Sequence, residues 1–335
     1  MNDLAYSGVN TTVRIMEGQL LKRDDFEAML KAPSLASALD LLSKSAYDFN
    51  AEEVLQSKDF ESFLMKGLQD AHQELIEIVP TKGLLEVFST LYTYHNLKVL
   101  LKEKFSGKDF DSLLIDIGAY PLDTLRALVE SAKNDNLPQV MVKAVSEAFE
   151  EFENFKRFET ADIIMDTYYF RHLKYLDKLL DNPIVHQIIT CTIDLENIAT
   201  LIRGIKQKQS RSFMQTVLSS AGTASKTKMI DTSQNENWSQ VLELFEALSI
   251  KDELAEILNH DTMDIEIIQL ELLKDRTIYN LLKDATFEPF GPFPSLAYIH
   301  AKEMEVKNLR LLLVGKDNGF SEQQIRERMR PIYGS

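Results

Sequence analysis

Three stretches of this chain repeat one another: YHNLKVLLK at residues 94–102, LENIATLIRG at 195–204 and VKNLRLLLVGK at 306–316. Each has an asparagine in third place, with apolar residues two positions before it and one, four and five positions after it. Those offsets trace one face of an α-helix. The three asparagines, Asn96, Asn197 and Asn308, are 101 and 111 residues apart. The spacing predicts three related, domain-sized helical units.

Helical periodicity extends outward from these segments. Apolar residues recur three or four apart over 59–79 and again over 82–105, and Pro80 and Gly107 stand where the two runs stop. We expect two long helices that form an antiparallel hairpin, with similar pairs on either side of Pro183 and of 289–294. Only 12 Gly and 9 Pro in 335 residues leave too few turn residues for an all-β fold.

The sequence therefore predicts an all-α fold with domains at 1–107, 108–208 and 209–335. One segment interrupts the pattern, because residues 201–230 hold six basic residues and no acidic ones. Small polar residues such as SSAGTASKTK gather in the same segment. We interpret about 219–237 as a mobile loop of the third domain.

The composition excludes several classes of protein. The formal net charge of −15 and the isoelectric point near 4.9 argue against general nucleic-acid binding, which needs a basic surface. The single cysteine, Cys191, cannot form an internal disulfide, which fits a reducing compartment. No run approaches 18 consecutive apolar residues, and the N-terminus lacks a signal-peptide pattern. We expect a cytoplasmic protein that does not itself insert into a membrane.

No catalytic or cofactor motif is present. The phosphate-binding pattern G-x-x-x-x-G-K-[ST] is missing, since Arg310 stands where the first glycine before Gly315-Lys316 would be. The six histidines are scattered without the spacing of metal ligands. Cys191 lies in an apolar helical run and is interpreted as a core residue. Glu159, Asp162 and Asp166 share one helix face, which is typical of a solvated surface in an acidic chain. We expect no cofactor and no metal.

The repeated asparagines are interpreted as structural. Asparagine inside a helix costs several tenths of a kcal/mol relative to alanine, so its return three times indicates a shared contact. We favour a helix-to-helix hydrogen bond within each domain.

The C-terminal segment is basic in an otherwise acidic chain, with seven basic and five acidic residues from 296 to 335. Ser321 and Gln324 predict a capping box before a short helix. The arginines Arg326, Arg328 and Arg330 follow, and two interpretations stay open for them: pairing within the chain, or docking onto an acidic partner.

The sequence resembles a known family, the C subunit of V/A-type rotary ATPases, whose eukaryotic counterpart is the d subunit. The closing segment is similar to that family's pattern A-K-E-x-E-x-x-N-[IL]-R followed by G-K and I-R-E-R, and residues 194–204 resemble its internal D-x-x-N-[IL] segment. The residues that match the closing pattern are Ala301, Lys302, Glu303, Glu305, Asn308, Leu309, Arg310, Gly315, Lys316, Ile325, Arg326, Glu327 and Arg328. Tyr6, Val13-Arg14 and Leu20-Leu21 resemble the family's first helix.

The resemblance implies three helical domains arranged as a funnel with pseudo-threefold symmetry. It also implies a rotor subunit of the central stalk, without catalysis of its own, on the cytoplasmic face of the membrane. Its partners would be the subunits of the central shaft and the proteolipid ring in the membrane. Its function would be to transmit torque for ATP-coupled proton or sodium transport.

Aromatic and arginine side chains tend to anchor interfaces, which makes seven residues the candidate partner contacts: Tyr168, Tyr169, Arg326, Arg328 and Arg330, followed by Tyr6 and Arg14. In the run Tyr168-Tyr169-Phe170 the three rings cannot all face one way on a helix, so at least one should point into a cavity or a partner. Two other functions stay open: an all-α scaffold of another assembly, and a helical hydrolase whose turnover would depend on Asp162 or Asp166.

Overall fold

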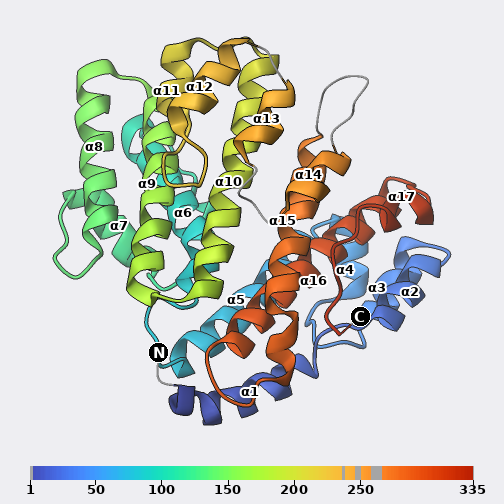
Figure 1. Cartoon of the computed structure of the whole chain (residues 1–335). Helices are drawn as coiled ribbons and strands as arrows, with labels where there is room; N and C mark the ends of the chain where they lie inside the picture. The colour runs from blue at the N-terminus through green and yellow to red at the C-terminus, as the bar shows by residue number, and fades with distance from the viewer. Residues whose placement is uncertain (1–2, 236–237, 246–249, 258–265, 335) are drawn as a thin grey trace. The chain divides into compact units, whose positions relative to one another are not determined.

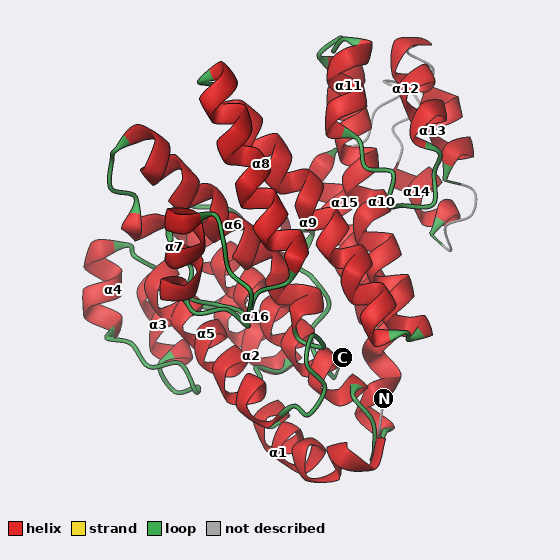
Figure 2. Ribbon diagram, turned by 90° about the vertical axis from the view of Figure 1, so that its left-hand side faces the viewer, coloured by secondary structure: helices red, strands yellow, loops and turns green. Residues whose placement is uncertain are grey.

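The structure, a computed structural model, describes residues 3–235, 238–245, 250–257 and 266–334. Throughout these ranges every regular element is a helix (Figure 2). The all-α prediction is therefore confirmed.

The chain divides into two compact units. Unit 1 joins the two ends of the chain, Met1–Leu85 and Ile278–Ser335, and unit 2 is Glu86–Thr277. The helix α15 (Ile267–Leu282) runs from one unit into the other. The three domain boundaries expected from the repeats stay a prediction.

Unit 1 is built on the long helix α16 (Phe293–Asp317), which packs against α5 (Glu61–Ile78), α1 (Ser7–Glu17) and α3 (Leu35–Leu42). Its shorter elements are η1 (Asp3–Tyr6), α2 (Arg23–Lys31), α4 (Ala51–Ser57), η3 (Lys283–Phe287) and α17 (Glu322–Arg326). The most C-terminal long helix is therefore held by helices from the beginning of the chain.

Unit 2 is built on α9 (Phe158–Leu180), which packs against α6 (Glu86–Ser106), α8 (Gln139–Phe155) and α10 (Pro183–Lys206). Figure 1 shows α6, α8 and α9 side by side in cyan and green. The remaining elements of this unit are η2 (Asp111–Leu113), α7 (Leu122–Ser131), α11 (Arg211–Val217), α12 (Lys226–Asn235), α13 (Trp238–Leu244) and α14 (Lys251–Ile257).

The predicted helix ends agree closely with the structure. The helix expected over 59–79 is α5, and the one expected over 82–105 is α6, which ends before Gly107 in the left-handed conformation (φ +67°). Asn182 caps α10 by accepting hydrogen bonds from two backbone N–H groups, and Pro183 is its first residue. The helices α9 and α10 pack together as expected. Because α5 and α6 belong to different units, their hairpin stays a prediction.

The loop expected at about 219–237 needs correction. Residues 219–225 are not helical, but Lys226–Asn235 forms α12, and 236–237 lie outside the described residues. The helix forms because Met229 and Ile230 are buried in the core of unit 2, against side chains of α10 and α11. Two adjacent apolar residues in a polar stretch were the signal for it.

Candidate functional site

Each repeated asparagine makes the same two hydrogen bonds to the backbone of one residue further along the chain. The side-chain Nδ2 of Asn96 donates to the carbonyl oxygen of Ile115 at 2.7 Å, and its Oδ1 accepts from the N–H of Ile115 at 2.9 Å. The same pair of bonds joins Asn197 to Ser219 (3.1 and 2.8 Å) and Asn308 to Arg330 (3.1 and 2.8 Å). We call these three pairs of bonds the asparagine clamps.

The partner differs from the one that the sequence led us to expect. Ile115, Ser219 and Arg330 all lie in non-helical segments, so a helix is clamped to a loop backbone rather than to another helix. In such a segment the N–H and C=O groups have no ladder to join, and an unpaired buried backbone group is costly. The amide satisfies both groups at once, which offsets the helix propensity that asparagine loses.

The turn that leads into each clamp is also repeated. Eleven residues after each asparagine the backbone has a positive φ, at Gly107 (+67°), Lys208 (+50°) and Gly319 (+72°). This left-handed residue ends the long helix and reverses the chain. A short helix follows, η2, α11 or α17, and then the clamped residue. Only two of the three positions are glycine, so the backbone path repeats more faithfully than the sequence.

Glycine seven residues after the asparagine has a packing role in two of the repeats. A Cβ on Gly315 would come within 2.9 Å of Ile325 of α17, and one on Gly204 would overlap the sulfur of Met214 of α11. The short helix thus sits directly on the long one. In the first repeat this position is Glu103, whose carboxylate instead accepts from the N–H of Phe110 at 2.8 Å.

The C-terminal signature residues hold α16 to the beginning of the chain. Lys302 and Glu305 form a buried ion pair at 2.8 Å, and the Lys302 ammonium lies 4.1 Å from the centre of the Tyr47 ring. Glu305 also accepts from the hydroxyl of Tyr47 at 2.9 Å and from the N–H of Leu21. Burial and the neighbouring Glu305 carboxylate raise the pKa of Tyr47.

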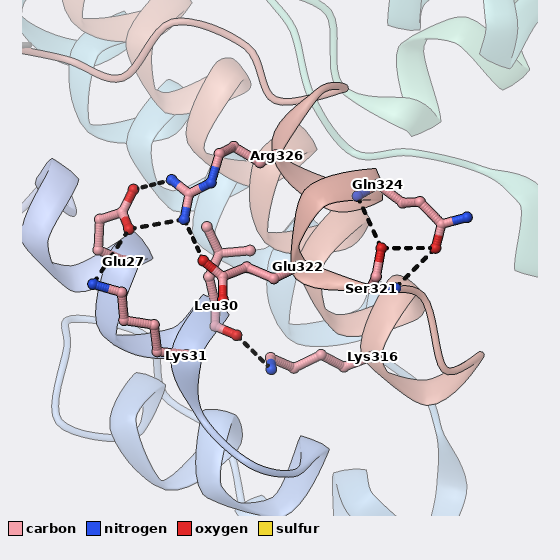
Figure 3. Close-up of polar contacts among 8 residues, drawn as sticks. All are labelled: Glu27, Leu30, Lys31, Lys316, Ser321, Glu322, Gln324 and Arg326. Atoms are coloured by element: carbon pink, nitrogen blue, oxygen red, sulfur yellow. Dashed lines mark hydrogen bonds and ion pairs between the residues drawn. The ribbon is translucent and has the colours of Figure 1, made fainter.

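A second group of signature residues lies at the end of α16 (Figure 3). Lys316 donates to the carbonyl oxygens of Leu30 and Ala32 at 2.9 and 2.7 Å, which satisfies the C-terminal end of α2. The guanidinium of Arg326 binds both carboxylate oxygens of Glu27 and also pairs with Glu322. The hydrogen bond and charge of Arg326 lower the pKa of Glu27. The Gly-Lys pair is therefore part of the packing of unit 1.

The predicted capping box is confirmed (Figure 3). The N–H of Gln324 donates to Ser321 Oγ, and the N–H of Ser321 donates to Gln324 Oε1 at 2.9 Å. It starts α17 and so positions Arg326 over α2.

Three of the candidate contact residues are used inside the protein. Tyr6 is fully buried, and Tyr168 is 6% exposed, with its hydroxyl donating to Glu147 at 2.6 Å. Arg14 pairs with Glu17 at 2.7 Å and donates to two carbonyl oxygens that follow or belong to η3. The structure shows these internal contacts, and a role of the three residues as partner contacts stays a prediction.

The remaining candidates divide. Arg326 is paired with Glu27, and the backbone of Arg330 is held by its clamp. Arg328 is exposed, and its guanidinium has no partner within the described ranges. Tyr169 lines a cavity of about 370 Å³ in unit 2 together with Phe170, while Tyr168 points into the core. Tyr168 thus faces away from the cavity that Tyr169 and Phe170 share, and the three rings do not all face one way, as their helical spacing predicts.

The residues considered for catalysis do not form a site in the described part of the chain. Cys191 is buried, and burial raises the pKa of its thiol to about 12, so it is not a nucleophile at neutral pH. Asp162 and Asp166 pair with Lys102 and Lys98 across the α6–α9 contact. Lys316 caps a helix instead of meeting a phosphate.

Among the residues that the structure describes, the carboxylates of Glu103, Asp109 and Asp111 are close enough to share a metal ion. Arg126 already pairs with Glu103 and Asp111 there. The guanidinium supplies the positive charge that a cation would bring. This acidic group therefore gives no support for a metal centre.

The helices of the described residues also bear on membrane insertion. None of them combines the length and the apolar character needed to cross a bilayer.

Sequence comparison identifies the family. The family model described as ATP synthase (C/AC39) subunit matches residues 9–328. The C subunit of the V-type sodium ATPase of Enterococcus hirae is 32% identical over 98% of this chain and 99% of its own length. The C subunit of the A-type ATP synthase of Methanocaldococcus jannaschii is 25% identical over 97% of this chain and 86% of its own length. The chain belongs to the ATP synthase (C/AC39) subunit family.

Proposed function

We propose that this chain is the rotor subunit that links the central shaft of a V/A-type ATPase to the proteolipid ring in the membrane. It transmits torque and has no catalytic site of its own. It lies on the cytoplasmic face and reaches the membrane only through the complex. The observation that carries this proposal is the match to its relatives in V-type and A-type ATPases along nearly the whole chain.

The asparagine clamps support a mechanical role. A torque-bearing linker must resist deformation, and long helices joined by loose connections would bend where the connections begin. Here the connection after α6, α10 and α16 is returned to its own helix by two hydrogen bonds. Close packing of the glycine-bearing helices adds stiffness, because protein interiors are as dense as organic crystals.

The closure of unit 1 supports the same role. The hydrogen bond of Tyr47 with Glu305 joins residues 258 positions apart in sequence, and the contact of Arg326 with Glu27 joins residues 299 positions apart. A rotor part is loaded repeatedly, and ties between the two ends of the chain would keep this unit from opening under load.

Affinity purification tests the proposal. The tagged chain, expressed at its natural level, is recovered from detergent-solubilised membranes and its companions are identified by mass spectrometry. We expect the shaft subunits, the catalytic head and the proteolipid ring in stable ratio. Companions from a different soluble assembly, without any ATPase subunit, would instead support the scaffold interpretation.

A coupling assay tests torque transmission. Complexes rebuilt in liposomes without this chain should hydrolyse ATP but move no ions, and adding the purified chain should restore ion transport. The chain alone should show no ATP turnover. Full ion transport by complexes that lack the chain would contradict the proposed linkage.

A further inference from the structure

Unit 2 has a cavity whose walls take no part in the asparagine clamps. It lies among α6, α9, α10, α11, α15 and the connection between α10 and α11, and its volume is about 370 Å³. That is the size of a small binding pocket. Its apolar walls come from Leu91, Tyr169, Phe170, Phe213 and Val217.

The apolar wall continues to the molecular surface of this unit. Leu91 is 54% exposed and Phe213 is 39% exposed. Each belongs to a different helix, yet both line the same cavity. Large apolar side chains gathered at the mouth of a cavity are typical of a binding surface, whereas singly scattered ones are not.

The charges in the cavity are unequally compensated. Of its acidic residues, Asp166 pairs with Lys98 and Glu196 pairs with Lys274 at 3.1 Å. Burial alone would lower the pKa of Lys274, but Glu196, Tyr169 and Asp275 together outweigh the burial and the net shift is upward, so Lys274 stays charged. Arg203 is exposed and has no partner within the described ranges. The unpaired charge of the cavity is therefore positive.

The positive charge extends beyond the cavity. Arg203 lies in the segment 201–230, which carries six basic residues and no acidic ones in a chain of net charge −15. Arg211 of this segment already pairs with Asp231 at 2.7 Å, so the argument for an occupant depends on Arg203 and the apolar mouth of the cavity. A small anion would pair with Arg203 but would leave the exposed Leu91 and Phe213 uncovered. A polypeptide that presents a carboxylate beside an apolar side chain would match both.

We propose that this cavity binds an acidic segment of another subunit of the same complex. An apolar side chain of that segment fills the space between the aromatic walls, and a carboxylate beside it pairs with Arg203. A buried apolar anchor next to a charged pair is the usual arrangement of a binding hot spot. The charge also speeds association, because oppositely charged surfaces steer encounter. This inference rests on the proposed function, since it takes its partner from the complex.

Site-specific crosslinking in the assembled complex tests it. Phe213 is replaced by p-benzoyl-phenylalanine in the tagged chain, the complex is purified and irradiated, and crosslinked peptides are sequenced by mass spectrometry. We expect a crosslink to another subunit within an acidic stretch. The yield should fall at least about fivefold in Arg203→Glu, a loss of about 1 kcal/mol of binding free energy or more. It should be unchanged in Lys206→Glu, which makes the same charge change on the same helix without lining the cavity.

The outcomes separate the two proposals. One outcome is that the chain purifies with ATPase subunits while residue 213 crosslinks only to its own chain, only to a basic segment, or to nothing. Any of these three results overturns this inference and leaves the proposed function standing. If no ATPase subunit copurifies, both are overturned. The circular dichroism spectrum and the Tm of each variant must match those of the parent, which shows that the variant folds. Phe170→Ala enlarges the cavity without changing its charge, and it should also reduce the crosslink yield.

Discussion

The cluster at the end of α16 and the cavity beside α10 are both rich in cations, yet they are built in opposite ways. In the first, Arg326 and Lys316 reach carboxylate or carbonyl oxygens of α2 and its end, within unit 1. In the second, Arg203 faces an open apolar cavity and has no partner in the described part of the chain. The signature residues Lys302, Glu305, Lys316 and Arg326 are thus occupied in holding the protein together. The segment 201–217 lies outside the family's closing pattern, and we propose the docking role for this segment instead of for the cluster at the end of α16.

The largest effect is expected where an internal charge is left alone. Glu305→Ala removes the carboxylate that pairs with the buried Lys302, so we expect unit 1 to lose about 3–5 kcal/mol of stability. Urea unfolding measures it. The double variant Lys302→Met, Glu305→Gln leaves no isolated charge and should recover part of the loss. Equal losses in the single and double variants would show that the pair itself is unimportant.

The next effect concerns pH, and it belongs to unit 2. Burial lowers the pKa of His172 to about 4, so the unfolded chain binds this proton more readily than the folded one. The stability that neutral His172 contributes is fully present above the unfolded pKa of about 6.5. It is lost as the pH falls toward 4, and the loss is at most about 3 kcal/mol. The neighbouring Glu86, 3.6 Å away, would reduce that loss while it stays ionised.

The matched control is His172→Phe, which keeps a ring of similar size beside Tyr94 and cannot titrate. Its unfolding free energy should depend less steeply on pH between about 6.5 and 4 than that of the parent. Identical slopes would mean that His172 is not buried in its neutral form.

The asparagine clamps should respond alike in both units. Replacing Asn96, Asn197 or Asn308 by Ala removes two hydrogen bonds and leaves a backbone N–H and C=O without partners, at a cost of about 1–3 kcal/mol each. Hydrogen exchange of the N–H groups of Ile115, Ser219 and Arg330 reports each clamp separately. One clamp that can be removed without effect would break the equivalence of the repeats.

A smaller effect separates two neighbouring arginines. Arg326→Ala should lower Tm, because Arg326 joins α17 to α2 through Glu27. Arg328→Ala should leave Tm unchanged, since surface changes of this kind usually stay within about 0.5 kcal/mol. Calorimetry on the two single variants gives the comparison, and equal shifts would contradict the contacts assigned to them.

The smallest effect is a gain. Lys208 occupies the left-handed position that is glycine in the other two repeats. Lys208→Gly removes the strain of a side chain in the left-handed conformation and should raise stability by less than about 1 kcal/mol. Lys206→Gly, at the last residue of α10 where the backbone is helical, should not raise stability and serves as the control. Thermal unfolding of both variants measures the two shifts, and a loss of stability in Lys208→Gly would show that its side chain contributes more than the strain removes.

Much of the fold can be predicted from the sequence because its signals are local. The ends of α5 and α6, the cap at Asn182 and the capping box at Ser321 depend on residues within one turn of the helix. The recurrence of the asparagines is equally visible in the sequence. Their partners are not, because a backbone group has no side-chain signature.

The candidate site could be predicted only in part. Tyr6 and Arg14 are of the residue types that are common in interfaces. In the structure Tyr6 is buried, and Arg14 donates to carbonyl oxygens in and after η3. Glu27 and Tyr47, which pair with signature residues, stand in stretches that show no motif. These pairs join residues that are far apart in the sequence and meet only in the folded chain. No local sequence pattern therefore predicts them.

If the signature cluster stabilises the protein while the cavity beside α10 binds a partner, one pair of variants separates the two roles. Tm of the isolated chain and the fraction assembled into the ATPase are measured for Arg326→Ala and Arg203→Glu. We expect a lower Tm with normal assembly of the folded protein for Arg326→Ala, and an unchanged Tm with reduced assembly for Arg203→Glu. The reverse pattern, with Arg203→Glu unfolding the chain and Arg326→Ala preventing assembly alone, would contradict both assignments.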